Sequence, residues 1–326
     1  MKRFRFLSVL IALAVTVTSF VACGDDEANG PQTKKDAVVA VLKNGNIDYW
    51  NQIATTVTTE CKRLGVEPII SFIDDNSNAG GQLSAVSLIS NLSEGYNVKG
   101  IIAAPVFTAT DHRVESKLAE VAGRDIPIII IDSPVDEAAS PLKGIYKAYV
   151  GTDNKAAGRL LAQKCGAKDP SAILTARVAI STPTVDRYSG FCEVMGQELP
   201  LWETVDLDTP ENFTAELAKH PNAKDIVFFN GNLCNSVKSA FKDVNVYTFD
   251  VYEQFLTDLK TPGSSIKGVM AQNTFEMGRQ AVKAIFEPVA EKNIYIPTIY
   301  ITSENIDAAE VQPFFDYYKY DNKRRW

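Results

Sequence analysis

The sequence predicts an α/β protein of two lobes, each built on a parallel sheet, with a polar turn between them. Three observations lead to this prediction. Short apolar runs alternate with segments of helical periodicity along nearly the whole chain, which is typical of parallel strands joined by helices. The alternation occurs twice, before and after the polar turn Gly151–Asn154. A chain of 326 residues is also long for a single hydrophobic core.

The first half contains consecutive strand–helix units. Its first strand is expected at residues 37–42, a continuous apolar run of the kind found in parallel strands buried on both faces. The helix that follows, residues 51–64, is predicted from the spacing of Ile53, Val57 and Cys61. The other elements expected here are strands 67–73, 98–104 and 126–131 and helices 82–92 and 111–123. Repeated units of this kind favour a doubly wound sheet with right-handed crossovers.

The second half repeats the pattern after the turn. Asp153 and Asn154 are expected to cap the next helix, residues 155–165. The remaining strands are expected at 174–180, 201–207, 225–229, 244–249, 266–271 and 295–301. The remaining helices are expected at 188–197, 211–219, 253–260 and 275–290, with one more that ends at residue 242. The tail, residues 313–326, is expected to be packed or frayed.

The N-terminus has the pattern of an export signal. Lys2, Arg3 and Arg5 precede an uncharged run at residues 6–22. A small residue directly before Cys23 and acidic residues after it resemble a bacterial lipoprotein signal, in which the cysteine carries the lipid. We therefore expect an exported, membrane-anchored lipoprotein, in the periplasm or on the cell surface, with Cys23 as the lipidated residue. An uncleaved membrane anchor is the alternative, although the run is at the short limit for crossing a bilayer.

Composition argues against several classes of function. With 33 basic and 40 acidic residues, a net charge of -7 and no basic stripe, the chain is not expected to bind nucleic acid. Only two histidines occur, and no nucleophile, phosphate-loop or metalloprotease motif accompanies them, so no catalytic residue, cofactor or metal is expected. Buried free thiols are the preferred interpretation of the widely spaced cysteines, although an exported compartment permits disulfides. These cysteines are Cys61, Cys165, Cys192 and Cys234.

Polar and aromatic residues follow strand after strand at the points where the strands end. In open parallel sheets ligands bind beyond the carboxyl ends of the strands, so two such sheets would line a ligand site from both sides. Carboxylates accept hydroxyl hydrogen bonds, a guanidinium donates several, and amides do both, which suits a neutral polyol such as a sugar. Flat aromatic faces suit the C–H faces of a sugar ring. The predicted ligand-binding residues are Tyr49, Trp50, Asp132, Arg187, Asn230, Asn232, Asp250 and Gln272.

On these residues the chain, from about residue 36 to 301, resembles the type 1 periplasmic binding proteins of the ribose/galactose-binding group, which share their fold with LacI-type effector domains. The matching positions are the aromatic pair Tyr49-Trp50, Asp132 after the fourth strand, Arg187 ahead of Ser-Gly-Phe191, Asn230 or Asn232, Asp250 after Thr-Phe249, and Gln272. The resemblance implies two Rossmann-like lobes joined by a multi-strand hinge, the periplasmic binding protein-like I fold. Ser133 stands where the group often has arginine, and Ala104 where it often has asparagine. These departures allow a bulkier, less polar or differently oriented ligand than ribose or galactose.

The resemblance also implies that the chain crosses between the lobes near Asn154, Gln272 and Ile301. The predicted parts are a signal peptide at 1–22, a tether at 23–36, an N-terminal lobe at 37–149 plus 273–300, and a C-terminal lobe with the tail at 150–272 plus 301–326.

The function that the resemblance implies is that of a lipid-anchored solute-binding protein. Its lobes would close over a sugar or sugar-like ligand, for uptake by an ABC transporter in the membrane. Two alternatives are the ligand-binding component of a membrane sensor and a cell-surface glycan-handling protein with an open groove. A glycoside hydrolase, with Asp132 and Asp250 as the acid–base pair, is a less favoured alternative.

Overall fold

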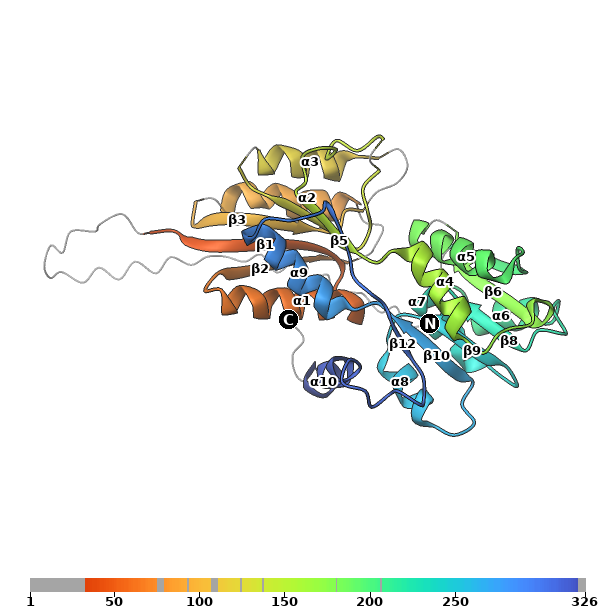
Figure 1. Cartoon of the computed structure of the whole chain (residues 1–326). Helices are drawn as coiled ribbons and strands as arrows, with labels where there is room; N and C mark the ends of the chain where they lie inside the picture. Colours follow the sequence, from red (N-terminus) through yellow and green to blue (C-terminus); the bar gives the residue numbers. More distant parts are fainter. Residues whose placement is uncertain are drawn as a thin grey trace, which may run out of the picture. The chain divides into compact units, whose positions relative to one another are not determined.

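In the described part of the chain, two six-stranded sheets form the framework of the protein (Figure 1). The computed structural model describes residues 33–74, 79–92, 94–106, 111–123, 125–136, 138–179, 181–205 and 207–321. The predicted signal peptide and Cys23 lie outside these residues, as does most of the predicted tether. Both sheets are largely parallel and carry helices on both faces, which confirms the predicted α/β class with two lobes.

The first sheet has the strand order β11-β5-β4-β3-β1-β2, and all neighbouring strands are parallel. Its strands are β1 (Lys35–Asn44), β2 (Glu67–Ile73), β3 (Tyr96–Ala103), β4 (Ile128–Ile131), β5 (Ala148–Gly151) and β11 (Asn293–Tyr295). One face is covered by α1 (Asp48–Arg63) and α9 (Thr274–Phe286), and the other by α2 (Ala79–Leu92) and α3 (Arg113–Ala122). Within β1, Val38 and Ala40 belong to the first core and Val39 and Val41 to the second. Burial on both faces explains why this strand is apolar without interruption.

The second sheet has the order β12-β10-β9-β8-β6-β7 and is parallel except where β12 runs against β10. Its strands are β6 (Ile173–Val178), β7 (Leu201–Thr204), β8 (Asp225–Phe228), β9 (Asn245–Phe249), β10 (Ile266–Ala271) and β12 (Ile299–Ile301). One face carries α4 (Asn154–Lys164) and α5 (Thr182–Met195). The other carries α6 (Pro210–Leu217), α7 (Gly231–Val237), α8 (Glu253–Lys260) and the C-terminal helix α10 (Gln312–Asp321).

Three crossings join the two sheets in the described chain. The first leads from β5 to α4 through the turn Gly151–Asn154, and the second leads from β10 to α9. The third lies between Tyr295, the end of β11, and Ile299, the start of β12. The single strand expected at 295–301 is therefore wrong, and residues 299–301 pair with the second sheet. Pro297 explains the break, because proline has no N–H to donate to a ladder.

Helices α1 and α5 begin several residues earlier than expected, and the tail is helical. Helix α1 starts at Asp48, three residues before the expected start. Helix α5 starts at Thr182 instead of residue 188, and Pro183 fits its first turn because its missing N–H would have no partner there. Phe314 and Tyr317 of α10 are buried in the second core, so the tail is packed as far as it is described.

The four cysteines of the lobes are buried and unpaired, which confirms the preferred interpretation. Burial raises the pKa of Cys61 to about 12 and that of Cys165 to about 11. Both thiols therefore stay protonated, and hence poorly nucleophilic, at neutral pH.

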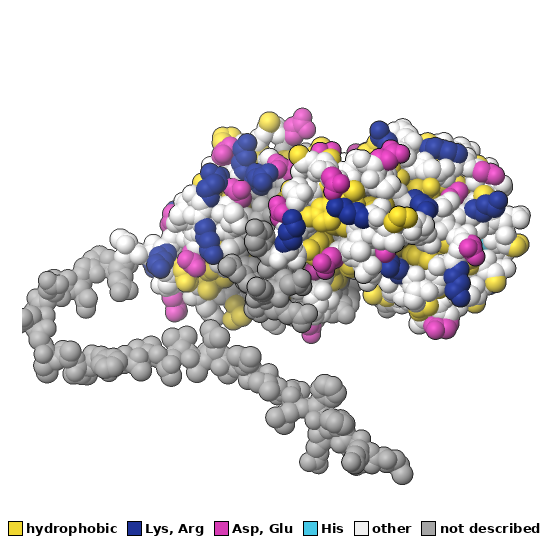
Figure 2. Space-filling view, turned by 90° about the horizontal axis from the view of Figure 1, so that it is seen from below, with side chains coloured by type: hydrophobic (Ala, Val, Ile, Leu, Met, Phe, Trp, Pro, Cys, Tyr) yellow, Lys and Arg dark blue, Asp and Glu magenta, His cyan; other side chains and the backbone are white. Residues whose placement is uncertain are grey.

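The surface is mixed in charge on the face shown in Figure 2, where Lys and Arg side chains lie among Asp and Glu. Among the described residues, no helix combines the length and the apolar character that crossing a bilayer requires.

Candidate ligand-binding site

Asp132 is the centre of a polar cluster at the carboxyl end of β4. Its backbone has a φ of 70°, in the left-handed region that Asp tolerates better than most residues. The Tyr49 hydroxyl donates to Asp132 Oδ1 at 2.6 Å, and the Ser133 hydroxyl donates to Oδ2 at 2.7 Å. The Tyr149 hydroxyl donates to the Asp132 carbonyl at 2.8 Å, which fixes the turn itself. The carboxylate is thus held in place before any ligand binds.

Lys43, which the sequence reasoning did not single out, completes this cluster. It lies at the end of β1, where its Nζ donates to Ser133 Oγ at 3.1 Å and lies 3.8 Å from Asp132 Oδ2. Its side chain is 14% exposed, and burial lowers its pKa, while the charge of Asp132 acts in the opposite direction. Lys43 therefore places a cation beside Ser133, the residue that stands where the resembling group often has arginine. The signal in the sequence was its place directly after the apolar run of the first strand.

The predicted aromatic pair separates in the structure. Tyr49 faces Asp132, whereas Trp50 is 4% exposed and belongs to the core of the first lobe. Their rings meet edge to face with centroids 4.9 Å apart. Because α1 begins at Asp48, the two residues are about 100° apart around the helix, so only Tyr49 bonds to Asp132, while the ring of Trp50 lies 5.5 Å from the Lys43 ammonium.

Ala104, the second departure noted in the sequence, is fully buried beyond the end of β3. The buried side chain of Gln82 fixes this segment, donating to the Ala104 carbonyl at 2.8 Å and accepting from Val106 N at 2.6 Å. This segment therefore has no asparagine side chain at residue 104, and its backbone is held in place by the side-chain amide of Gln82 on α2.

Arg187 projects from α5 into the second lobe and is 3% exposed. Its Nε donates to Asn154 Oδ1 at 2.8 Å, and its Nη1 donates to the Phe229 carbonyl at 3.0 Å. The guanidinium lies 4.3 Å from the centre of the Phe249 ring, a cation–π contact. Among the described residues, none accepts a bond from its remaining nitrogen, Nη2.

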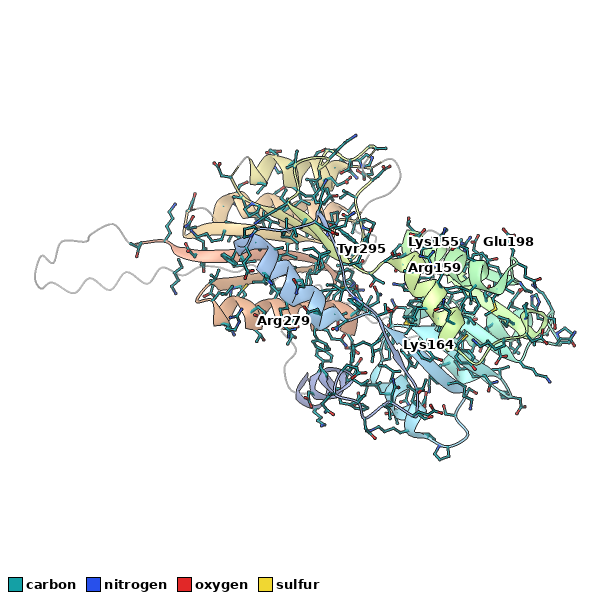
Figure 3. The ribbon with its side chains drawn as sticks, viewed as in Figure 1. Lys155, Arg159, Lys164, Glu198, Arg279 and Tyr295 are labelled. Atoms are coloured by element: carbon teal, nitrogen blue, oxygen red, sulfur yellow. The ribbon has the colours of Figure 1, made fainter. Side chains whose placement is uncertain are left out.

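A close helix–helix contact sets the position of this arginine. A Cβ on Gly158 of α4 would lie 2.0 Å from the Arg187 carbonyl oxygen, and one on Gly190 of α5 would lie 2.0 Å from that of Lys155. Only glycine allows the two backbones to approach so closely. Lys155 and Arg159, which lie on α4 in Figure 3, both pair with Glu193 of α5. Asn154, at the start of α4, is thereby brought within reach of Arg187.

Asp250 is the counterpart of Asp132 in the second lobe. It follows β9 directly and also has a positive φ, 63°. The backbone N–H of Gly231 donates to its Oδ2 at 3.2 Å, and Gln272 Nε2 donates to its Oδ1 at 2.7 Å. Thr152 Oγ1 donates to Gln272 Oε1 at 2.9 Å, and both of these residues are buried. A continuous chain of hydrogen bonds therefore links the first crossing, the second crossing and the second carboxylate.

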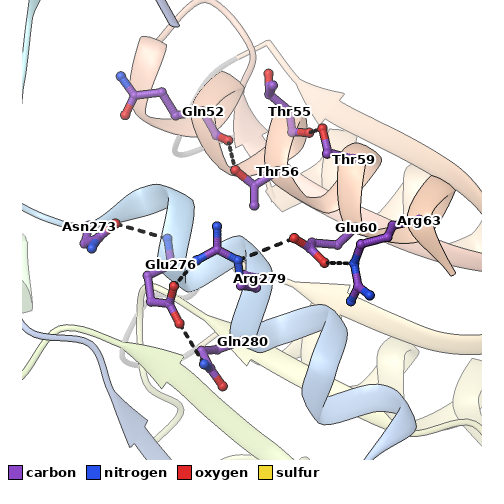
Figure 4. A network of polar contacts seen from close by, with 10 residues as sticks. All are labelled: Gln52, Thr55, Thr56, Thr59, Glu60, Arg63, Asn273, Glu276, Arg279 and Gln280. Carbon is purple, nitrogen blue, oxygen red and sulfur yellow. Dashed lines mark hydrogen bonds and ion pairs between the residues drawn. The ribbon is translucent and has the colours of Figure 1, made fainter. Parts of the chain in front are cut away.

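Helix α9, which follows the second crossing, is anchored to the first lobe. Asn273 caps it by accepting from Glu276 N at 3.1 Å, and Arg279 donates to Glu60 of α1 at 3.4 Å (Figure 4). In the first crossing Asp153 caps α4 through Ala156 N at 2.9 Å, which confirms its expected role. Asn154 is the first residue of α4 and orients Arg187 instead of capping the helix.

The two candidate asparagines have different tasks within the protein. Asn230 caps α7, its Oδ1 accepting from Leu233 N at 2.9 Å. Asn232 accepts a short hydrogen bond from the Tyr252 hydroxyl. Both amide oxygens are thus used by the chain itself, whereas neither amide nitrogen has an acceptor among the described residues.

The charges of the two carboxylates and of the arginine all act on the pKa of Tyr49. Burial raises the pKa of Tyr49 well above its ordinary value, the charge and hydrogen bond of Asp132 raise it further, and so does Asp250 from the second lobe. Arg187 acts on the same pKa in the opposite direction. Charged groups at the strand ends of both sheets therefore act on one hydroxyl. Such a set can accept and donate hydrogen bonds around a polar ligand of small size.

Comparison with known proteins agrees with the fold described above. A family model of the periplasmic binding protein domain matches residues 38–292. A search of curated proteins finds no match.

Solved structures share the fold across their whole length. GanP, a glucose-galactose binding protein from Geobacillus stearothermophilus, is 20% identical, with 83% of this chain and 99% of that chain covered and a TM-score of 0.66. A carbohydrate transporter solute binding protein from Agrobacterium radiobacter in complex with D-arabinose is 20% identical, with 86% and 98% covered and a TM-score of 0.70. An ABC transporter solute binding protein from Agrobacterium vitis bound with alpha-D-tagatopyranose is 17% identical, with 85% and 98% covered and a TM-score of 0.70.

Proposed function

The chain belongs to the periplasmic binding protein family, and from this premise we propose that it is a lipid-anchored solute-binding protein for a sugar or sugar-like molecule. The ligand binds between the lobes, which close around it by motion about the three crossings. The closed form is then recognised by an ABC transporter, which takes up the ligand.

The observation that carries this proposal is the pair of hydrogen-bonded carboxylates beyond the strand ends of the two sheets: Asp132, which accepts from Tyr49 at 2.6 Å, and Asp250, which accepts from Gln272 at 2.7 Å. The charges balance, because Lys43 and Arg187 offset the two carboxylates. A neutral ligand rich in hydroxyls is therefore preferred to an anion or a cation. Charge-assisted hydrogen bonds to such hydroxyls are the strong kind, which suits tight capture of a small polar molecule.

The size of the ligand is argued from the fold relatives. GanP is named for glucose and galactose, and other relatives were solved with D-arabinose or alpha-D-tagatopyranose. We infer a ligand of the size of a monosaccharide. Its polar groups would differ from those of ribose and galactose where they face Lys43, Ser133 and Ala104.

We also propose that the site binds without catalysing a reaction. Each carboxylate already accepts two hydrogen bonds from its own chain: Asp132 from Tyr49 and Ser133, and Asp250 from Gly231 and Gln272. Oxygens that the chain itself holds as hydrogen-bond acceptors suit the binding of a ligand's hydroxyl groups.

Location completes the proposal. The export signal and the lipid on Cys23 would hold the two lobes outside the cytoplasm on a tether. Substitution Cys23→Ser should release the exported protein from membranes, and its retention there would count against the lipid anchor.

The test of the ligand is a thermal-shift screen of the folded lobes against monosaccharides, polyols, nucleosides and oligosaccharides, backed by native mass spectrometry of freshly purified protein. A ligand raises the melting temperature because it binds only the folded state. We expect at least one monosaccharide to do so. If no carbohydrate, polyol or nucleoside shifts it, the sugar proposal fails. Binding of oligosaccharides alone would indicate glycan handling, and release of product from a glycoside would indicate a hydrolase.

Asp250→Asn tests the site itself. It removes the charge but keeps a side chain that tolerates the left-handed backbone, and we expect affinity to fall about tenfold or more. Asp243→Asn is the matched control, since Asp243 has a φ of 54° and is exposed before β9. Equal affinities of the two variants would remove Asp250 from the site.

A further inference from the structure

The C-terminal helix α10 is anchored firmly in the second lobe. Phe314, Tyr317 and Tyr318 are each less than 10% exposed and belong to the core that α8 also lines. Phe315 packs against the same core, and the ammonium of Lys260 lies 4.4 Å from the centre of its ring. The helix therefore moves with the second lobe.

From this position α10 contacts the segment that carries Asp250. The Tyr318 hydroxyl donates to the Val251 carbonyl at 3.0 Å, one residue after the carboxylate. The next residue, Tyr252, donates to Asn232, the candidate amide of α7. The backbone that follows β9 is thus held by a hydrogen bond from α10.

The helix also contacts the second crossing. Phe275, the second residue of α9, packs edge to face on Phe314 with ring centres 5.2 Å apart and lies 6.4 Å from the ring of Tyr317. Phe275 follows Gln272 by three residues, and Gln272 holds Asp250. The rings of α10 therefore lie against the element about which the lobes turn.

The third contact reaches the first lobe. The Tyr317 hydroxyl donates to Asp48 Oδ1 at 3.5 Å, and Asp48 is the first residue of α1, directly before Tyr49. Burial raises the pKa of Tyr318 above its ordinary value, and the charge of Asp48 raises it further, so that carboxylate lies close to both tyrosines. A single helix thus contacts the first turn of α1, the second crossing and the Asp250 segment.

We infer that α10 couples the two halves of the ligand site, with Tyr317 as a positioning residue that acts through Asp48 on Tyr49. The inference rests on the proposed function for its effect on ligand binding, because it takes Tyr49 and Asp250 as ligand contacts. Held by Tyr317, the first turn of α1 presents Tyr49 to Asp132 in a fixed relation to the second lobe. Asp48 also interacts with Tyr318, so loss of the Tyr317 hydroxyl weakens the link between α10 and the first turn of α1 and loosens that turn.

The test compares Tyr317→Phe, which keeps the ring but removes the hydroxyl, with Asp316→Asn on the same helix. Asp316 contacts only Gln312 and Lys319 of α10 among the described residues, so it controls for any general effect on the helix. In Tyr317→Phe we expect amide hydrogen exchange of residues 48–52 to quicken about three- to tenfold, and the affinity for the screened sugar to fall by a similar factor. Asp316→Asn should change neither.

A double-mutant cycle of Tyr317→Phe and Asp48→Asn distinguishes a positioning effect on Tyr49 from a general loss of protein stability. If Tyr317 acts through Asp48, the double variant binds sugar no more weakly than the weaker single variant, and the melting temperatures of all variants stay close to that of the parent. Unchanged exchange in residues 48–52 of Tyr317→Phe, or additive losses of affinity, would overturn the inference. If the parent binds no sugar at all, the proposed function fails, while the exchange measurement still decides whether the coupling exists.

Discussion

Replacing Arg187 by lysine is the sharpest probe of the second lobe's half of the site. The guanidinium makes two hydrogen bonds, to Asn154 Oδ1 and to the Phe229 carbonyl, while it covers the ring of Phe249. A lysine keeps the charge, but its single nitrogen cannot donate to both acceptors and lie flat on the ring. One buried acceptor then loses its donor, which costs about 1–3 kcal/mol, and the weaker ring contact adds about 0.5–1 kcal/mol. We expect the free energy of unfolding to fall by about 1.5–4 kcal/mol.

Urea denaturation followed by tryptophan fluorescence measures this loss, since Trp202 is buried in the second lobe and Trp50 in the first. The control is Arg159→Lys on α4, whose side chain is 39% exposed and pairs with Glu193 at 3.0 Å. An exposed pair of this kind contributes little, so the control should stay within about 0.5 kcal/mol of the parent. Calorimetric titration should also show at least about tenfold weaker sugar binding for Arg187→Lys, because its fork of donors is lost. If both variants unfold at the same urea concentration, the assignment of a buried, bidentate role to Arg187 is refuted.

Two further predictions concern the first lobe and the hinge. Burial lowers the pKa of Lys43 below its ordinary 10.5, so sugar affinity should fall as pH rises through that lowered pKa and the ammonium becomes neutral. Over the same window, up to 10.5, the free energy of unfolding of the parent should rise relative to that of Lys43→Met, because the unfolded chain binds the Lys43 proton more tightly. The buried cysteines, whose pKa is raised, act equally in both proteins and cancel in this difference. A parent affinity that stays constant to pH 10.5 would contradict this reasoning. Thr152→Val should lower the free energy of unfolding by about 1–2 kcal/mol, because the buried Gln272 Oε1 loses its donor at 2.9 Å. Thr214→Val is the control, because Thr214 is exposed on α6 and, among the described residues, its hydroxyl donates to the Pro210 carbonyl of the same helix. This variant should change the free energy of unfolding by less than about 0.5 kcal/mol. Equal urea midpoints for the two variants would show that the hinge bond does not stabilise the protein.

The fold could be predicted because the parallel strands are buried on both faces. That condition demands unbroken apolar runs such as Val38–Val41, and such runs are visible without any structure. Edge strands are short and half exposed, so they carry a weaker signal. The strand expected at 295–301 failed for this reason, although Pro297 marked the break between β11 and β12.

The site could be predicted only in outline. The carboxyl ends of β4 and β9 place Asp132 and Asp250 where the strand-end rule puts them, but that rule says nothing of their hydrogen-bond partners. Lys43 was missed because its partner Ser133 is 90 residues away in the chain and only the sheet brings the two together. Whether the predicted residues touch a ligand stays a prediction.

The start of α1 shows how a small error in one boundary changes a side chain's surroundings. A loop would let Tyr49 and Trp50 share one face, whereas a helix from Asp48 turns the tryptophan into the core. Local sequence gave no side-chain cap to mark that start, because the N-cap position is Ile47. Boundaries without a cap are read least well from sequence.

The left-handed backbone at both Asp132 and Asp250 has a consequence for how this protein can diversify. A side chain larger or more branched than Asp or Asn is strained at such a position, and glycine alone is free of strain but carries no ligand group. The backbone therefore restricts both positions to Asp, Asn or Gly. New specificity would have to arise around them, at Lys43, Ser133 and the segment that Gln82 holds.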